Sequence, residues 1–279
     1  MRNNLERLGA NQEAQSSDIL PQAVEQTGLN FIVPTEHVVL PSKGLFYPAN
    51  HPLHKQDTIE IKQMTAKEED ILTSRNLLKK GVALDKLIQS IIVDKRINTD
   101  TLTVEDRSAI VLAARISGYG PDYNTVVTCP ACSEKSKNKF NLLEKLDSID
   151  DIAPATVDDS GLFTVVLPIT KWNVKCRALT GYDEKTIMRL TEAKKNLTEG
   201  DSLLTDQLKM TVVSIDGVTD KQILEKALLN MPARDSKHLR TVYQETVKGV
   251  DMRHSFSCSK CEYVGDLEVP LTADFFWFK

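Results

Sequence analysis

Four of the five cysteines form two Cys-x-x-Cys pairs, Cys129/Cys132 and Cys258/Cys261. Strand-like residues precede each pair, as in a zinc knuckle, in which two thiols lie on a tight turn between strands. A zinc ribbon is built from two knuckles that converge on one tetrahedral ion. The spacing therefore predicts a structural zinc held by four thiolates, although residues 133–257 form a far longer insertion than an ordinary ribbon has. The pattern does not decide between one shared ion and two.

Other uses of these cysteines stay open. A thioredoxin-type redox pair opens a helix after a strand, whereas Cys132 is followed by another strand-like segment, Asn138 to Leu143. Two local disulfides need an oxidising compartment, and separate free thiols leave the pairing unexplained. His254 precedes Cys258 by four residues, and a mixed zinc site in which its imidazole replaces one thiolate is a further alternative. Cys176 is alone on an alternating segment and is expected to be a buried small residue.

The two cysteine pairs belong to a longer internal match. An offset of 129 residues aligns Cys129 with Cys258, and further matched pairs follow the same offset: Asp106 with Asp235, Ile110 with Leu239, Gly120 with Gly249, and Asp122 with Asp251. Farther upstream, Val174 to Arg177 corresponds to Ile59 to Lys62. We interpret this as an α+β fold of two tandem copies of a strand–three-helix–zinc-knuckle hairpin unit, sharing a zinc-ribbon-like site and packed about a pseudo-two-fold axis. Convergent helical patterning is the alternative.

Local signals give the expected elements of the first copy. Ile59 to Lys62 alternates like a half-buried strand, and Thr65 with Glu68 forms a capping box that starts a helix ending at Gly81. A second helix follows from apolar residues at helical spacing, from Leu84 to Ile92, and Thr103 starts a third.

These signals divide the chain into five predicted segments. They are a flexible or extended N-terminal arm (1–33), an extended segment with turns (34–56), the first repeat with the Cys129/Cys132 knuckle (57–147), a linker (148–162), and the second repeat with the Cys258/Cys261 knuckle and an aromatic tail (163–279).

Composition and motifs exclude several functions. The 35 Lys and Arg against 39 Asp and Glu give a net charge of −4, so the chain has no large overall basic surface for nucleic acid. No apolar run is long enough for a membrane segment, and the N-terminus lacks the apolar run of a secretory signal, so a cytosolic origin is expected. The sequence has no Gly-rich phosphate loop and no hydrolase motif, and four thiolates would close a zinc coordination sphere. We therefore expect no enzyme activity.

Nucleic acid is nevertheless the basis of an alternative function. Lys135, Lys137, Lys139 and Lys260 lie around the knuckles with Tyr263, which is compatible with a zinc-ribbon nucleic-acid-binding regulatory protein. The same hairpins carry Glu134, Glu262 and Asp266, so the surface is not of one sign, and nucleic-acid binding is not favoured.

The C-terminus carries four consecutive aromatic residues, Phe275, Phe276, Trp277 and Phe278. A terminal strand alternates its faces, so four rings cannot all cover one core. Aromatic clusters are common interface anchors, and we expect this segment to bind a partner.

The sequence also resembles a known family. The likeness is carried by the run from His37 to Pro48 (HVVLPSKGLFYP), the run from Ile61 to Leu72, and Tyr119 to Cys132 with its first knuckle. Over about residues 36–146, and more loosely in the second half, it resembles the baseplate hub subunit or baseplate hub assembly proteins of T-even-type (T-four-like) contractile-tailed bacteriophages. The resemblance implies a virion protein of the tail baseplate, assembled in the host cytoplasm. It also implies binding to other baseplate, hub or tail-tube proteins, with a homo-oligomer compatible, and no catalysis.

Overall fold

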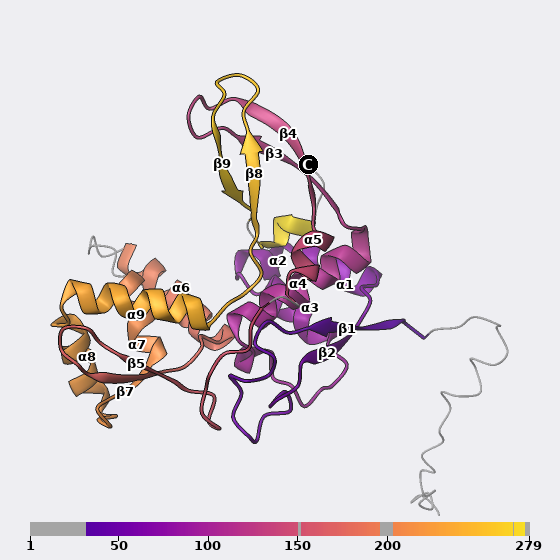
Figure 1. The fold of residues 1–279 in the computed structure, drawn as a ribbon. Helices are drawn as coiled ribbons and strands as arrows, with labels where there is room; N and C mark the ends of the chain where they lie inside the picture. The colour runs from indigo at the N-terminus through magenta and orange to yellow at the C-terminus, as the bar shows by residue number, and fades with distance from the viewer. Residues whose placement is uncertain (1–31, 150–151, 196–202, 270, 277–279) are drawn as a thin grey trace, which may run out of the picture. The chain divides into compact units, whose positions relative to one another are not determined.

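The computed structural model describes residues 32–149, 152–195, 203–269 and 271–276. Thr35–Lys279 forms one compact unit, and its described residues combine small antiparallel sheets with helices (Figure 1). The predicted α+β class is confirmed. The predicted arm, apart from its last two residues, lies outside the described residues. Within the described ranges, no helix is both long and apolar enough to span a membrane.

The first half of the unit runs to residue 149. Its elements are β1 (Thr35–Val39), β2 (Thr58–Lys62), α1 (Ala66–Thr73), α2 (Arg75–Lys79), α3 (Ala83–Ile91), the 3-10 helix η2 (Thr99–Thr101), α4 (Val104–Tyr119), β3 (Asp122–Thr128), β4 (Lys135–Asn141) and α5 (Leu143–Asp147).

The second half begins at residue 152. Its elements are β5 (Phe163–Val166), β6 (Asn173–Cys176), α6 (Gly181–Lys195), α7 (Leu203–Thr211), β7 (Val212–Ile215), α8 (Lys221–Leu229), α9 (Ala233–Thr246), β8 (Arg253–Ser257), β9 (Val264–Glu268) and the 3-10 helix η3 (Ala273–Phe276).

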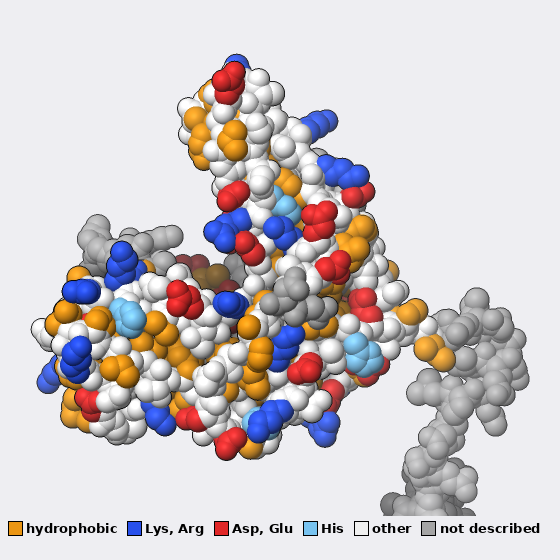
Figure 2. Space-filling view, viewed as in Figure 1, with side chains coloured by type: hydrophobic (Ala, Val, Ile, Leu, Met, Phe, Trp, Pro, Cys, Tyr) orange, Lys and Arg blue, Asp and Glu red, His pale blue; other side chains and the backbone are white. Residues whose placement is uncertain are grey.

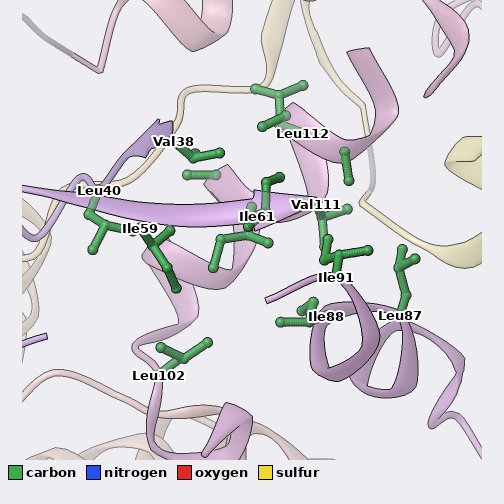
Figure 3. Close-up of a cluster of buried hydrophobic side chains, with 14 of the residues drawn as sticks. Val38, Leu40, Ile59, Ile61, Leu87, Ile88, Ile91, Leu102, Val111 and Leu112 are labelled. Carbon is green, nitrogen blue, oxygen red and sulfur yellow. The ribbon is translucent and has the colours of Figure 1, made fainter. Parts of the chain in front are cut away.

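The core of the first half forms where β1 and β2 meet α3 and α4. Val38 lies opposite Ile59 in the antiparallel register of β1 and β2. Figure 3 shows the side chains of these strands beside Leu87, Ile88 and Ile91 of α3, and these three side chains are fully buried. The helix periodicity predicted from Leu84 onward is confirmed, because this apolar stripe is the face of α3 that the core covers.

The predicted helix from Thr65 to Gly81 is interrupted in the structure. The carboxylate of Glu68 accepts hydrogen bonds from the backbone N–H and hydroxyl of Thr65, so the predicted start is confirmed. Ser74 then adopts an extended conformation (φ −64°, ψ 106°) and separates α1 from α2. Serine competes with helical hydrogen bonding and favours helix starts. The break leaves Leu72 buried and Leu78 exposed.

A second core fills the second half. Its buried side chains come from β5, β6, β7, the helices α7, α8 and α9, and adjoining loops, and include Leu167, Val174 and Leu239. The segment Val212–Ile215, in which three of four residues are β-branched, forms a third strand that pairs with β6. At the corresponding place of the first half, an isolated bridge joins Ile61 to Ile92. Neither half, over its described residues, is the predicted single strand followed by three helices, because each has more elements than that.

The two halves nevertheless share polar contacts at the matched positions. Thr180 donates its N–H and hydroxyl to Asp183, as Thr65 does to Glu68, and a cation six residues before each carboxylate pairs with it: Lys62 with Glu68, and Arg177 with Asp183.

A pair of matched aspartates makes the second shared contact. Asp106 and Asp235 are both fully buried. Asp106 accepts a hydrogen bond from the N–H of Ser42, after β1, and Asp235 accepts from the N–H groups of Ile169 and Thr170, after β5. Each aspartate therefore fixes the loop that follows the first strand of its half.

Candidate metal centre

The first cysteine pair lies on the turn between β3 and β4. The register of these strands ends at the pair Thr128 and Lys135, directly beside the cysteines. The N–H of Cys129 donates to the carbonyl of Glu134 at 2.8 Å, and the N–H of Ser133 donates to the carbonyl of Cys129 at 2.9 Å. Ser133 has a positive φ of 58°, which lets the chain turn back tightly after Cys132.

The second cysteine pair is held in the same way. The N–H of Cys258 donates to the carbonyl of Tyr263 at 2.8 Å, and Glu262 has a φ of 55°. Glu262 is the residue that the offset of 129 aligns with Ser133. Both turns therefore have the geometry expected of zinc knuckles, although they are far apart in the sequence.

The four thiols converge between the two turns. All four Sγ atoms lie within 4.8 Å of one another, and none of the cysteines is in a disulfide. Sγ of Cys129 lies 3.6 Å from that of Cys261, and Sγ of Cys132 lies 3.7 Å from that of Cys258. A tetrahedral zinc with Zn–S bonds of about 2.3 Å requires sulfur atoms roughly 3.8 Å apart. The donor set and its spacing therefore fit one four-thiolate zinc.

The surroundings of the thiols favour a metal-binding role. The backbone N–H groups of Lys260 and Cys261 donate to the Cys258 thiol and lower its pKa to about 7. At Cys261 the backbone N–H of Tyr263 also lowers the pKa, but hydrogen bonds with the neighbouring thiols outweigh it and raise the pKa to about 12. Of these two thiols, Cys258 is therefore the one that ionises first. A thiolate is the form that binds zinc. Across the site, the ammonium of Lys260 pairs with the carboxylate of Glu134 and joins the two turns. Cys129 and Cys258 are buried, whereas Cys132 and Cys261 are exposed.

The hairpins β3–β4 and β8–β9 lie side by side (Figure 1), and their side chains pack on each other. Cys129, Phe256 and Cys258 form a small buried cluster, against which Val127 and Leu267 pack. The Phe140 ring stacks on His254 with 4.4 Å between centroids. Lys145 adds a hydrogen bond of 2.6 Å from its ammonium to the carbonyl of Arg253.

The mixed site with His254 is not supported. The group of possible ligand atoms that lie within 4.8 Å of one another contains the four thiols and not the His254 imidazole. That imidazole packs on Phe140, and burial lowers its pKa. Cys176 lies elsewhere, in the second core, where burial raises its pKa to about 12, as expected of a small core residue.

The aromatic C-terminus differs from the expected strand. Phe275 and Phe276 lie in η3, are 1% and 0% exposed, and pack into the first core against Tyr119 and Tyr123. A 3-10 turn places consecutive side chains about a third of a turn apart, so both rings reach the same core. Trp277 and Phe278 lie outside the described residues. The predicted partner contact of this segment stays a prediction.

Sequence reasoning missed Arg115, a fully buried cation of α4. Its guanidinium donates to the carbonyls of Gly120 and Phe275, and lies over the rings of Tyr119 and Tyr123. Arg115 thereby ties the end of α4 to η3 beneath the first hairpin. The only signal in the sequence is a charged residue within an apolar helix.

Residues 35–158 match the sequence model of the family described as T4 bacteriophage base plate protein. The range runs from β1 past α5, and so contains the first knuckle but not the second. No curated protein and no solved structure matches the chain. The resemblance to T-even-type phage baseplate proteins is confirmed over this range of the chain.

Proposed function

We propose that the chain is a structural or assembly component of the hub region of a contractile phage tail baseplate, stabilised by one structural zinc. The single observation that carries the metal assignment is the convergence of Cys129, Cys132, Cys258 and Cys261, from two distant hairpins, at zinc–thiolate spacing. The match of residues 35–158 supports the baseplate role. Hub location, and contacts with other hub or tail-tube proteins, rest on the resemblance.

The zinc would act as a clip between the two halves. Each half supplies one hairpin and two thiolates, so neither knuckle alone completes a tetrahedral site. The free energy of metal binding adds directly to the free energy of folding. Four protein ligands would leave no open position for substrate, which supports a role without catalysis.

We also propose that the two halves arose as tandem copies, residues 57–147 and 163–272. The support is the agreement of polar contacts at aligned positions: the buried aspartates, the Thr–acid pairs at helix starts, and the two turns with their Cys N–H bonds. The contacts between the thiols follow the same alignment. When each cysteine is replaced by its aligned counterpart, the contact between Cys129 and Cys261 becomes the contact between Cys258 and Cys132. That exchange is the local pseudo-two-fold relation expected of two copies.

Metal analysis of the full chain tests the zinc clip. We expect one zinc per chain, and Cys258→Ser should lose it and lower the free energy of unfolding by at least several kcal/mol, because the binding free energy of a structural zinc, on the order of 10 kcal/mol, adds to the folding free energy. Cys176→Ala is the control, because it removes a cysteine outside the site and should keep the metal. A wild-type chain without zinc, or a Cys258→Ser variant with full zinc content, would contradict the proposal.

Complementation of a phage that lacks this protein tests the baseplate role. Since Phe275 and Phe276 belong to the core, removal of Trp277–Lys279 separates partner binding from folding. We expect the shortened chain to fold with one zinc and to support fewer particles. Normal particle yield would refute the aromatic anchor, and normal yield in the absence of the whole protein would refute the assembly role.

A further inference from the structure

The two hairpins of the metal centre present outward faces of opposite charge. Residues alternate between the faces of a strand, and the inward residues, such as Phe140 and Phe256, are buried between the hairpins. The outward residues of each hairpin are exposed, and these two faces lie on opposite sides of the hairpin pair.

The outward face of β3–β4 is basic. It carries Lys135, Lys137 and Lys139, spaced two residues apart along β4, beside the exposed Val126 of β3. We call these four residues the basic face. Lys139 pairs with Asp122 at 2.8 Å, whereas Lys135 and Lys137 form no ion pair with any described residue. Figure 2 shows Lys and Arg side chains along the β4 side of the hairpin pair.

The outward face of β8–β9 is acidic. It carries Asp266 and Glu268, two residues apart along β9, with Val264 before them at 73% exposed. We call these three residues the acidic face. Arg253 of β8 shares this outward face, because it lies opposite Glu268 in the register. It donates two hydrogen bonds of 2.8 Å to Asp251, and its charge also interacts with Asp266 and Glu268. Among the described residues, the ion pair of Arg253 is with Asp251, and neither Asp266 nor Glu268 lies within ion-pair distance of a cation.

We propose that the basic face of one chain docks on the acidic face of a second copy. Both faces have the same design: an exposed valine, and charges that repeat every second residue at about 7 Å. Val126 of one copy would then contact Val264 of the next, while the lysines meet Asp266 and Glu268. Valine burial would supply contact area, and opposite charge would fix the register and exclude docking of like faces.

This docking is head-to-tail and has a consequence for assembly. Because the two faces lie on opposite sides of the hairpin pair, each added copy leaves one basic and one acidic face free. Head-to-tail contacts form closed rings or open filaments. We expect species larger than a dimer.

Sedimentation velocity of the full zinc-containing chain tests the proposal, over roughly two orders of magnitude in protein concentration. The wild-type sedimentation coefficient should rise with concentration in about 0.05 M salt and fall in about 0.5 M salt, because exposed charges are screened. Variant A, Lys135→Glu with Lys137→Glu, and variant B, Asp266→Lys with Glu268→Lys, should each weaken association at least about tenfold.

Mixing the variants provides the decisive measurement. Variant A has two acidic faces and variant B two basic faces, so the mixture should associate at concentrations at which each variant alone is mainly monomeric. Lys221→Glu with Lys226→Glu on α8 is the control for variant A, because it makes the same change of net charge away from the hairpins, and it should associate like the wild type.

Zinc content of each variant, measured in the same samples, separates this proposal from the metal clip. A wild type that stays monomeric, stops at a dimer, or associates equally well after charge reversal overturns the docking proposal and leaves the zinc assignment intact. A monomer that instead binds duplex DNA through the basic face, with salt-sensitive affinity lost in variant A, also overturns it.

Discussion

In each half of the molecule, a buried aspartate fixes the loop after the first strand, but the groups that donate hydrogen bonds to the two aspartates differ. Asp106 accepts hydrogen bonds from the hydroxyls of Ser42 and Tyr47 as well as from one N–H, whereas the described partners of Asp235 are two backbone N–H groups. Burial dominates at Asp106 and raises its pKa. At Asp235 burial acts in the same direction, but the backbone donors outweigh it and lower the pKa. A polar anchor can thus keep its place while the packing around it changes.

The cores of the two halves differ more than these anchors do. The first core receives long-range additions from the second half of the sequence, including Met252, Val269, Phe275 and Phe276. The second core is built from β5 to α9, and among the described residues the first half adds to it only the partly buried Phe46. The boundary between the two cores therefore differs from the boundary between the two halves of the sequence, because residues near the C-terminus belong to the first core.

Removal of a ring from the C-terminal segment should produce the largest difference between the two cores. Phe276→Ala leaves a cavity in the first core and should cost about 3–5 kcal/mol of unfolding free energy. Hydrogen exchange should show lost protection in α4 and retained protection in β6. Phe276→Leu, which keeps most of the volume, is the control. Equal loss of hydrogen-exchange protection in α4 and β6 would show that the two cores unfold as one unit.

The buried aspartates test whether the anchors are energetically equivalent. Asp106→Ala leaves two hydroxyls and an N–H without their acceptor in a buried site and should cost roughly 3 kcal/mol. Asp235→Ala should cost less, because it leaves two partly buried N–H groups. Urea unfolding measures both, with Asp220→Ala, at the exposed start of α8, as a comparison. A larger cost at Asp235 would reverse the ranking.

Glu105 should give the first half a pH dependence that the second half lacks. Burial raises its pKa to about 8, and its aligned counterpart, Arg234, is exposed. The folded state therefore holds a proton that the unfolded chain releases near pH 4.3. Its stabilising effect is complete below the unfolded pKa and is lost as the pH rises towards 8.

Glu105→Gln should remove this loss. The variant should have a free energy of unfolding close to that of the wild type near pH 5 and a higher one near pH 8.5. The two chains are compared at each pH, because contributions common to both, such as protonation of the thiols, then cancel. Glu184→Gln, at a half-exposed neighbour, should leave most of the slope in place. An unchanged slope in the Glu105 variant would locate the pH dependence elsewhere.

The capping ion pairs should give the smallest effect. Arg177→Gln removes two hydrogen bonds, of 2.6 and 2.8 Å, from Asp183, whereas after Lys62→Gln the Glu68 carboxylate keeps Ser90 and Thr65. Each change should cost about 1 kcal/mol or less, with Arg177→Gln the more costly. Thermal unfolding at low and high salt checks the order. A larger effect of Lys62→Gln would contradict it.

The elements predicted from local sequence signals are confirmed where neighbouring residues determine the structure. Thr65 and Thr103 start helices, the stripe of α3 is buried, and the alternation around Ile59 and Ile61 is a half-buried strand. The predictions that differed from the structure depended on distant contacts. Ser74 breaks a helix whose two parts have different exposure, and Phe275 and Phe276 turn into a core built about 160 residues earlier, where Arg115 binds the carbonyl of Phe275.

By itself, the sequence determined the residue types that can bind zinc, the two turns that carry them and the alignment of Asp106 with Asp235, because these depend on short spacings and on repeated patterns. Only the tertiary structure decided that the four thiols meet at one point and that the hairpins bury their inner faces on each other. It also decided that the second half completes the first core. These outcomes depend on burial and long-range packing, and the free energy of such contacts is not encoded in any local window of the chain.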